Sequence, residues 1–461
     1  MKKNDRMRIL VISFMFLVVA VPNIWGQGRV KKPNVIIFFM DDQGYEDVGV
    51  FGSPLIKTPN LDEMAGNGMR FTDFYSASPV CSPSRAALLT GAYPPRVNVP
   101  VVLWPNKEGG LSNKELTIAD MLKTKKYTTA CIGKWHLGDE AQYLPIKQGF
   151  DSYYGIPFSN DMSANTSAKV ADNILFREGM TLDSLREEKW RGGQVPLFRQ
   201  DEVIEYPVDQ TTLTQRYTQE ALGFIQKNKD NPFFLYVAHT MPHIPLYASD
   251  NFKGKSARGL YGDVIEELDW SMGQILKSLE TLEIDDNTLV IFASDNGPWK
   301  LDNGHGGSAY PLRGYKFNTY EGGMRVPMIA QWKGQIPANT VCSEVTSTID
   351  ILPTVAYLTD CKLPDEKIDG YNIWPIMQGK SKKSPHAKTG FYYYKKTTAE
   401  AVRKENWKLR RVEGVIELFN LDEDISETTN VASSNPKKVR ELTKMLDEFD
   451  AELKTDVNRY Q

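Results

Sequence analysis

Cysteine is scarce in this chain: only 4 of 461 residues are cysteine, and no two of them form a CxxC pair. This excludes a disulfide-rich scaffold and a structural zinc site of the CxxC type. Cys131 is expected to be buried in a strand, whereas Cys342 and Cys361 are candidates for one disulfide in an oxidising compartment. Net charge is also low, because 55 basic and 58 acidic residues nearly balance, so the composition gives no reason to expect nucleic acid as a partner.

Long hydrophobic runs are absent after residue 30, so we expect no stable insertion of the chain into a membrane. At the N-terminus, basic residues precede an apolar run from Ile9 to Val21, and small residues follow near Gly26. This pattern is typical of a signal peptide, which we place at residues 1–27, and it predicts an exported protein, periplasmic or secreted. A membrane anchor is the alternative, but about 13 apolar residues are fewer than the roughly 20 that span a bilayer.

The rest of the chain alternates short apolar runs with helical patterns, as in a mostly parallel sheet whose strands are buried on both faces. The clearest runs are Val35 to Met40, Tyr127 to Ile132, Phe233 to Ala238 and Leu289 to Ala293. We predict an α/β fold with a large, mostly parallel central sheet flanked by helices, forming a catalytic domain at residues 28–380. Residues 381–461 are predicted to form a smaller C-terminal α+β subdomain with a small antiparallel sheet and one helix. Residues 159–206 lack periodicity and are predicted to be an insertion that shapes the substrate pocket.

Polar residues follow all four apolar runs. They are Asp41 and Asp42, then Lys134 and His136, then His239 and His243, then Asp295 and Asn296. Ligand sites in open α/β sheets lie beyond the carboxyl ends of the strands, so these residues are expected to converge. Adjacent carboxylates repel unless a cation lies between them, and oxygen ligands suit a hard divalent ion. We therefore predict a metal site, although each acidic pair alone is also compatible with a turn or a helix cap.

The segment from Cys81 to Gly91 indicates a loop that enters a helix, with Pro83 near the first helical position. Cys81 is thereby placed at a helix N-terminus, where unpaired N–H groups favour anions and lower the pKa of a thiol. A charged ester such as a sulfate suits this position. Taken alone, a single cysteine is more often a small buried hydrophobic residue.

Cys81-Ser82-Pro83-Ser84-Arg85 resembles the signature of the type I sulfatase family, which is Cys or Ser, any residue, Pro, any residue, Arg, and the match extends through Leu88-Leu89-Thr90-Gly91. The resemblance implies an alkaline phosphatase-like fold and a maturation enzyme that converts Cys81 to formylglycine, whose hydrate is the nucleophile. It assigns Arg85 to holding the nucleophile and its metal environment. Asp41, Asp42, Asp295 and Asn296 match the metal ligands of the family, usually calcium, and the sequence does not distinguish calcium from magnesium.

Three further segments resemble blocks of the same family. They are Gly133-Lys134-Trp135-His136, Pro242-His243-Ile244-Pro245 and the segment from Gly314 to Pro327, which contains Lys316. The resemblance implies that Lys134 binds a sulfate oxygen and that His136 takes a proton from the formylglycine diol. It also implies that His243 binds sulfate and helps to protonate the leaving oxygen, while Lys316 offsets negative charge there. One departure is Lys126 before Tyr127, where the family commonly has glycine, and this change affects a turn.

These residues predict a sulfuric ester hydrolase that removes O-sulfate from a carbohydrate. A wider resemblance to exported glycan sulfatases of the arylsulfatase A and N-acetylgalactosamine-sulfatase kind favours galactose or N-acetylgalactosamine sulfate. Trp299, His305 and Arg313 are predicted to line the sugar subsite, with Trp299 stacking on a pyranose and Arg313 holding a hydroxyl or carboxylate, although core or loop roles remain equally open. His239 is open between substrate binding and a structural role.

Two other functions are compatible with the same residues. One is a phosphate or phosphonate ester hydrolase of the same fold, although the complete set of basic residues favours sulfate. The other is a catalytically silent glycan-binding homologue, although no catalytic position is substituted. Asn165-Thr166-Ser167 also fits a glycosylation acceptor, which matters only in a eukaryotic secretory pathway.

Overall fold

An 11-stranded sheet forms the centre of the fold in the computed structural model, which describes residues 32–301, 303–457 and 460. The predicted signal peptide lies outside the described residues. Across the sheet the strands are β12 (Thr340–Cys342), β2 (Met69–Phe71), β11 (Met328–Gln331), β10 (Thr288–Ser294), β1 (Asn34–Met40), β9 (Phe233–Ala238), β4 (Thr128–Gly133), β5 (Ser152–Gly155), β7 (Leu197–Arg199), β8 (Glu202–Tyr206) and β6 (Val170–Phe176). The four apolar runs predicted from the sequence form β10, β1, β9 and β4, which are neighbours and parallel.

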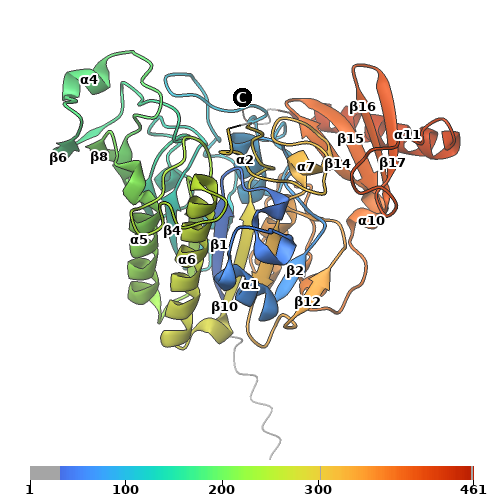
Figure 1. Cartoon of the computed structure of the whole chain (residues 1–461), viewed down its shortest axis with the longest axis horizontal. Coiled ribbons are helices and arrows are strands. Elements are labelled where there is room, and N and C mark those ends of the chain that lie inside the picture. Colours follow the sequence, from blue (N-terminus) through green and yellow to red (C-terminus); the bar gives the residue numbers. More distant parts are fainter. Residues whose placement is uncertain (1–31, 302, 458–459, 461) are drawn as a thin grey trace, which may run out of the picture. The chain divides into compact units, whose positions relative to one another are not determined.

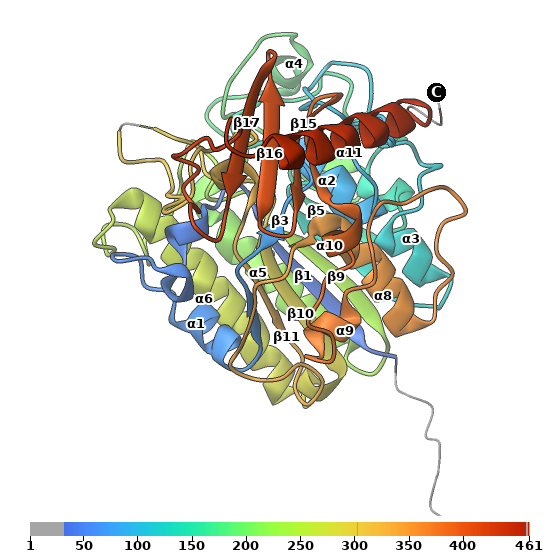
Figure 2. The ribbon, with the colours of Figure 1, turned by 90° about the vertical axis from the view of Figure 1, so that its right-hand side faces the viewer.

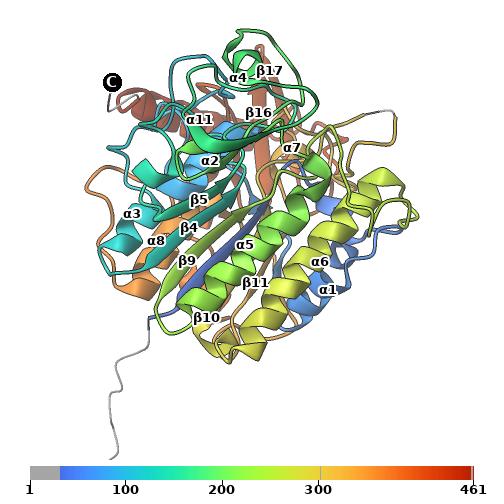
Figure 3. The same ribbon diagram turned by 90° about the vertical axis from the view of Figure 1, so that its left-hand side faces the viewer.

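Helices cover both faces of this sheet, and the alternation of side chains along β1 shows why both must be covered. Val35, Ile37 and Phe39 pack into the core on one face, which also holds buried residues of α2 (Cys81–Thr90), α3 (Ile118–Lys123) and α8 (Ile351–Thr359). Ile36 and Phe38 pack on the other face, beneath α1 (Pro59–Gly66), α5 (Leu213–Asn228) and α6 (Leu260–Thr281). Figure 3 shows α5 and α6 side by side on that face, and Figure 2 shows the side of α3 and α8. The predicted α/β architecture is confirmed.

The C-terminal part forms the predicted small sheet with one long helix. Its strands are β14 (Phe391–Lys395), β15 (Thr398–Lys404), β16 (Trp407–Val412) and β17 (Val415–Asn420), all antiparallel, and its helix is α11 (Pro436–Lys454). Leu442 and Leu446 of α11 are fully buried in a core shared with this sheet, and Phe449 stacks on Tyr392 with ring centroids 3.8 Å apart. The boundary at residue 380 stays a prediction, because residues 32–461 form one compact unit.

Short elements complete the chain. They are the strands β3 (Phe74–Tyr75) and β13 (Thr346–Ser347), which pair with each other, and the helices α4 (Leu182–Arg186), α7 (Glu321–Met324), α9 (Trp374–Met377) and α10 (His386–Thr389). No helix in the described part of the chain is both long and apolar enough to cross a membrane.

Lys126, the departure from the family pattern, has a φ of 64°. Glycine adopts this left-handed conformation without a steric cost, so the geometry explains why the family commonly has glycine here. The N–H of Lys126 donates to the carbonyl of Lys123 in the turn that precedes β4. The substitution is therefore confined to a turn.

Three predictions about individual residues have clear outcomes. Cys131 is fully buried in β4, as expected, and Cys342 and Cys361 are free cysteines with no disulfide between them. Asn165 is only 5% exposed, and its side-chain oxygen accepts hydrogen bonds from the N–H and hydroxyl of Ser167. The asparagine of the predicted glycosylation motif therefore closes a turn inside the fold instead of presenting its amide on the surface.

A buried ionic cluster ties the C-terminal sheet to α7, which lies in the same segment as Lys316. The Lys408 ammonium on β16 contacts Glu321 at 2.9 Å and Glu427 at 2.8 Å, and all three side chains are fully buried. Glu427 also accepts a hydrogen bond from the backbone N–H of Glu321. Glu321 also has Arg325 at 3.4 Å, so the loss of Lys408 removes the cation that Glu427 shares with it and leaves Glu427 as the uncompensated buried carboxylate.

Replacing Lys408 with methionine is expected to lower the free energy of unfolding by about 3 kcal/mol, because removing one partner leaves uncompensated buried charge. Chemical denaturation measures this change. The matched control is Lys404→Met on the adjacent strand β15, where Lys404 pairs with Glu441 at 3.1 Å near the surface. That control should cost less than about 1 kcal/mol. Equal costs for the two variants would contradict a special role of the buried cluster.

Candidate active site and metal centre

The predicted catalytic and metal residues lie together at the carboxyl ends of the central strands. Asp41 and Asp42 follow β1, Lys134 follows β4, and Asp295 follows β10, so the parallel arrangement brings them to one edge. Figure 1 shows α2 in the upper part of the view, between the segment that carries β6, β8 and α4 and the C-terminal sheet. The site is therefore built from segments more than 250 positions apart in the sequence.

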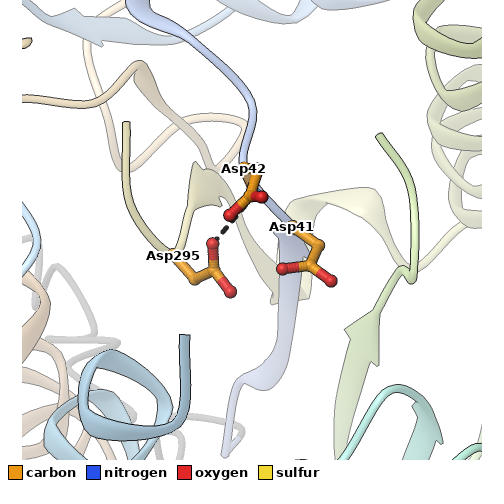
Figure 4. A group of neighbouring side chains, drawn as sticks. All are labelled: Asp41, Asp42 and Asp295. Atoms are coloured by element: carbon orange, nitrogen blue, oxygen red, sulfur yellow. Dashed lines mark hydrogen bonds between the residues drawn. The ribbon is translucent and has the colours of Figure 1, made fainter. Parts of the chain in front are cut away.

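Three carboxylates form the centre of the site (Figure 4). Asp41, Asp42 and Asp295 each bring an oxygen within 4.8 Å of the others, and all three side chains are buried. The backbone N–H of Asp42 donates to Asp295 Oδ1 at 3.0 Å, and the Asn296 amide donates to Asp42 Oδ1 at 2.7 Å. Asp42 has a φ of 65°, so its backbone turns sharply where β1 ends.

These residues fit a hard divalent cation. Among the described residues, the buried oxygens Asp41 Oδ1 and Asn296 Oδ1 have no hydrogen-bond partner, and buried oxygens without a partner are costly. Burial, together with the charge of Asp41, raises the pKa of Asp295 to about 7. A cation bound among these oxygens would relieve both costs, and carboxylate and amide oxygens are the ligands that calcium and magnesium take.

Three basic side chains surround the carboxylates, one for each. Arg85 donates two hydrogen bonds to Asp295 Oδ2, at 3.0 and 2.8 Å. Lys134 Nζ lies 2.6 Å from Asp41 Oδ2, and Lys316 Nζ lies 2.8 Å from Asp42 Oδ2. Because the three positive and three negative charges cancel, a bound divalent ion would leave two positive charges to attract an anionic substrate.

Asp41 shows the electrostatic effect of these neighbours. Its burial works against ionisation, but Lys134, His243 and Arg85 together hold its pKa well below the usual range. The carboxylate is therefore charged at neutral pH and available as a ligand.

Cys81 is the first residue of α2 and is only 2% exposed. The expected effect of the helix N-terminus on its thiol is wrong: burial raises the pKa of Cys81, and the nearby Lys134 and Lys316 do not reverse this. Removing a thiolate from water costs more here than the local positive charge returns, and Asp41 and Asp295 also oppose ionisation. The unmodified thiol is therefore a poor nucleophile at neutral pH.

His136 is fully buried and held in one orientation. Its Nε2 lies 3.0 Å from the carbonyl oxygen of Leu103, which can only accept, so Nε2 carries the proton. Burial, together with the charges of Lys134 and Arg85, keeps the pKa of this imidazole well below the usual value. In the neutral ring Nδ1 is then an acceptor, and it has no partner among the described residues. This arrangement is suited to a general base.

His243 lies beside the acidic cluster, with Nε2 3.5 Å from Asp42 Oδ2. Its Nδ1 lies 2.6 Å from the carbonyl oxygen of Ile244 and 3.1 Å from Asn160 Oδ1. Burial, with the charge of Lys316, lowers the pKa of this histidine. The ring therefore presents Nε2 toward the centre of the site.

Ser159 and Asn160 belong to the site but carry no signal in the sequence. Lys134 donates to Ser159 Oγ at 3.1 Å, and the same hydroxyl lies 3.3 Å from His243. Asn160 also donates to the carbonyl of Pro245 at 2.9 Å, which fixes its amide next to His243. Both residues begin the predicted insertion, and no pattern of polar residues marks them there.

Replacing Asn160 with alanine is expected to lower kcat roughly 10- to 100-fold, because residues that orient a reacting imidazole have effects of this size. KM should change much less, since Asn160 holds the ring from behind. Steady-state kinetics on an aryl sulfate measures both values. Asn165→Ala, in the same segment but bonded to Ser167, is the control and should keep kcat. A rise in KM at constant kcat would contradict the orienting role.

Trp299 is the one predicted sugar-subsite residue that the structure brings next to the cluster. Its ring centroid lies 5.6 Å from that of His243, and Lys316 Nζ lies 4.7 Å from the same ring. The ring also meets Phe317 edge-on at 5.3 Å. Trp299 is partly exposed.

Two of the other predicted sugar-subsite residues make their contacts away from the carboxylate cluster. Arg313 donates to the carbonyl of Glu427 at 2.7 Å and lies over the ring of Tyr320, so its guanidinium binds the C-terminal part. His305 is exposed in a loop, where its backbone N–H donates to the side chain of Asn303. Within the described residues, no hydrogen bond or ion pair joins Arg313 or His305 to the acidic cluster of Asp41, Asp42 and Asp295.

His239 has the structural role that the sequence left open. It is fully buried on the face of the sheet covered by α5 and α6, with ring centroids 5.0 Å from Phe38 and 5.9 Å from Tyr217. Its Nε2 lies 3.3 Å from Ser271 Oγ, and burial lowers its pKa to about 3. These contacts with Phe38, Tyr217 and Ser271 favour the structural alternative for His239.

A buried carboxylate cluster that fits a cation, next to a helix N-terminus at the carboxyl edge of a layered α/β sheet, is suited to the hydrolysis of anionic esters. The chain belongs to the sulfatase family. The family model described as Sulfatase matches residues 33–361, and the one described as N-sulphoglucosamine sulphohydrolase, C-terminal, matches residues 315–455. The protein is therefore a sulfatase, an enzyme that hydrolyses sulfate esters, and the predicted family is confirmed.

Similar proteins with known names support this membership. The N-acetylgalactosamine-6-sulfatase of Mus musculus is 38% identical over 416 residues, which cover 86% of this chain and 75% of that protein. Arylsulfatase A of Homo sapiens is 38% identical over 372 residues, which cover 80% and 72%. A solved structure of Ps i-CgsB in complex with k-i-k-neocarrahexaose matches with a TM-score of 0.77 and 32% identity, covering 91% of this chain and 93% of the other.

Proposed function

We propose that this sulfatase removes O-sulfate from a carbohydrate, using a formylglycine made from Cys81 and a bound calcium ion. The observation that carries the proposal is the packing of one buried helix-terminal residue, Cys81, with Lys134 and Lys316 as charged neighbours beside three buried carboxylates. Such a pocket is positive once a cation is bound and thus suits a sulfate ester. The raised pKa of the thiol supports a nucleophile other than thiolate.

A maturation enzyme would convert Cys81 to formylglycine, and the hydrated aldehyde would supply a hydroxyl. Its oxygen forms a bond to sulfur while the bond from sulfur to the sugar oxygen breaks. The proton of the attacking hydroxyl passes through His243 Nε2 to the sugar oxygen, which leaves as the alcohol, and Lys316 offsets negative charge on the same oxygen. Sulfate is then held on residue 81 as a covalent ester.

Release of sulfate uses the second hydroxyl of the hydrate. His136, neutral and with Nδ1 available, takes the proton of this hydroxyl. The carbon–oxygen bond to the sulfate then breaks, so the aldehyde is restored and sulfate leaves. Lys134 and Arg85 remain in place throughout, Lys134 on a sulfate oxygen and Arg85 on the metal-binding carboxylate.

Asp41, Asp42, Asp295 and Asn296 would hold the calcium ion, and magnesium fits the same oxygen donors. When bound, the ion polarises the sulfate and stabilises negative charge that develops on its oxygens. Asp42 and Asn296 are already joined by a hydrogen bond of 2.7 Å, so two of the four donors are held in position without the ion.

The sugar is proposed to be a sulfated galactose or N-acetylgalactosamine. One relative is named N-acetylgalactosamine-6-sulfatase, and one similar structure contains a neocarrahexaose. Trp299, with its ring beside His243, is proposed to stack on the sugar, because indole rings bind the apolar face of a pyranose well. An exported location, with residues 1–27 as a cleaved signal, completes the proposal.

The test compares matured, purified enzyme on 4-nitrophenyl sulfate and 4-nitrophenyl phosphate. We expect the sulfate to be hydrolysed far faster, with mass spectrometry showing aldehyde in place of thiol at residue 81. Faster hydrolysis of the phosphate would support a phosphate or phosphonate ester hydrolase. Glycan binding without sulfate release by fully matured protein would instead support a silent binding homologue.

A further inference from the structure

Two tryptophans lie next to each other on the surface, in segments far apart in the sequence. Trp104 is 46% exposed and Trp190 is 57% exposed, and their ring centroids are 5.9 Å apart. Val101, which is 43% exposed, is close in sequence to Trp104. Single exposed apolar residues are ordinary, but two neighbouring indoles form a patch that usually marks a binding surface.

The segment that carries Trp104 is attached directly to the catalytic residues. Leu103, the preceding residue, accepts a hydrogen bond from His136 through its carbonyl, at 3.0 Å. Its N–H donates to the hydroxyl of Ser82, the residue after Cys81, at 3.1 Å. Trp104 therefore directly follows a residue that is hydrogen-bonded to both His136 and Ser82.

The segment that carries Trp190 is attached to the other catalytic histidine. The N–H of Gly193 donates to the carbonyl of Asp161 at 3.0 Å, and Asp161 follows Asn160, the partner of His243. A pocket of about 710 Å³ lies along this connection, within the usual range of roughly 300–1,000 Å³ for ligand sites. Its polar lining includes Arg177, Asp209 and Gln210.

A direct link fixes the two segments to each other. Asn106, two residues after Trp104, accepts a hydrogen bond from the N–H of Thr166 at 2.9 Å and donates to the carbonyl of Ala164 at 3.2 Å. Thr166 and Ala164 both belong to the segment 159–206, which also carries Trp190. The Asn106 side chain thus joins the two segments that carry the indoles before any ligand binds, which lowers the entropic cost of binding.

We propose that Trp104 and Trp190 form a stacking platform for a second sugar ring, next to the one that carries the scissile sulfate, so that the preferred substrate is a glycan chain. The proposal rests on the proposed function. Because its two segments are hydrogen-bonded to the surroundings of both catalytic histidines, this surface lies where a further part of a bound substrate can reach it. A pyranose fits it because its C–H face packs on indole while its hydroxyls reach the polar pocket.

The test measures kcat and KM for the wild type, Trp104→Ala and Trp190→Ala. The substrates are two matched pairs: N-acetylgalactosamine 6-sulfate with a chondroitin 6-sulfate tetrasaccharide, and galactose 4-sulfate with a carrageenan tetrasaccharide. For the tetrasaccharide that the wild type prefers, we expect KM to rise about ten-fold or more in each variant, the size of one good aromatic contact. The monosaccharide and 4-nitrophenyl sulfate should change less than about two-fold.

Two controls separate recognition from stability. Trp104→Phe keeps an aromatic face and should restore most of the tetrasaccharide KM. Tyr357→Ala removes an aromatic side chain that is 63% exposed on α8, which Figures 2 and 3 show apart from the segment that carries α4. This variant should behave as wild type on every substrate.

Three outcomes would overturn the platform. The first is equal losses on a monosaccharide and its tetrasaccharide, and the second is a selective loss on 4-nitrophenyl sulfate, which would assign the patch to an apolar aglycone. The third is a wild type that uses neither tetrasaccharide better than its monosaccharide. If that enzyme still hydrolyses 4-nitrophenyl sulfate, its sulfatase chemistry stands while the platform fails, so the two failures are distinguishable.

Discussion

Cys81→Ala lowers the rate of sulfate ester hydrolysis at least about 10⁴-fold, because removing a nucleophile leaves only binding and electrostatic stabilisation. This is the largest effect that we expect of any substitution. The measurement is kcat on 4-nitrophenyl sulfate with protein from a host that matures the wild type. The fold should survive, since the side chain is small and lies at the start of α2.

Cys131→Ala is the matched control, because this thiol is equally buried but lies within β4. It should lose some stability and keep its activity, which separates chemistry from packing. Cys81→Ser adds a sharper readout. A serine hydroxyl can accept sulfate once but has no second hydroxyl to expel it, so one equivalent of alcohol should be released and the peptide containing residue 81 should keep a sulfate. Activity of Cys81→Ala within ten-fold of wild type would refute the assigned nucleophile.

Removal of the metal is expected to lower kcat/KM at least about 10³-fold, since a cation that polarises the substrate contributes several kcal/mol to the barrier. A chelator followed by metal analysis prepares the metal-free enzyme, and addition of calcium or magnesium identifies the ion that restores activity. Stability gives an independent readout. Oxygens of three buried carboxylates lie within 4.8 Å of one another, so the ion should raise Tm, and the increase should continue to grow with the logarithm of the free ion concentration above Kd.

Asp41→Asn is the control for this experiment. The variant loses the carboxylate held by Lys134, so the chelator should then change neither its activity nor its Tm appreciably. Full wild-type activity in a preparation shown to contain no metal would eliminate the ion from the mechanism.

Much of the fold followed from the sequence because the central strands are buried on both faces. A strand enclosed by two helical layers is mostly apolar, and β1, β9 and β10 have this composition apart from polar residues at the ends of β1 and β10, while β4 has it in its second half. The strands β5, β7 and β8 are only 4, 3 and 5 residues long, which is too short for an alternating pattern to be recognised in the sequence. The chemistry was readable for a related reason: Asp41 and Asp295 directly follow buried strands, and the direction of a parallel strand already determines where its end lies.

The fine structure of the site did not follow from local patterns. His239 and His243 are four residues apart after the same strand, yet the first is enclosed by Phe38 and Tyr217 and the second faces Asp42. Only the path of the chain between them decides this. Arg313 likewise lies near Lys316 in sequence but binds the carbonyl of Glu427, more than 100 residues later.

The amino-acid sequence by itself determined which side chains can perform the reaction and at which edge of the sheet they gather, because side-chain chemistry and strand polarity are local properties. Tertiary structure alone decided how charged those groups are and what lies around them. Burial raised the pKa of Cys81 against the local effect of its helix, and folding placed Asn160 behind His243 and Trp190 against Trp104. Desolvation and contacts between distant segments depend on the whole packed chain, and no short stretch of sequence records them.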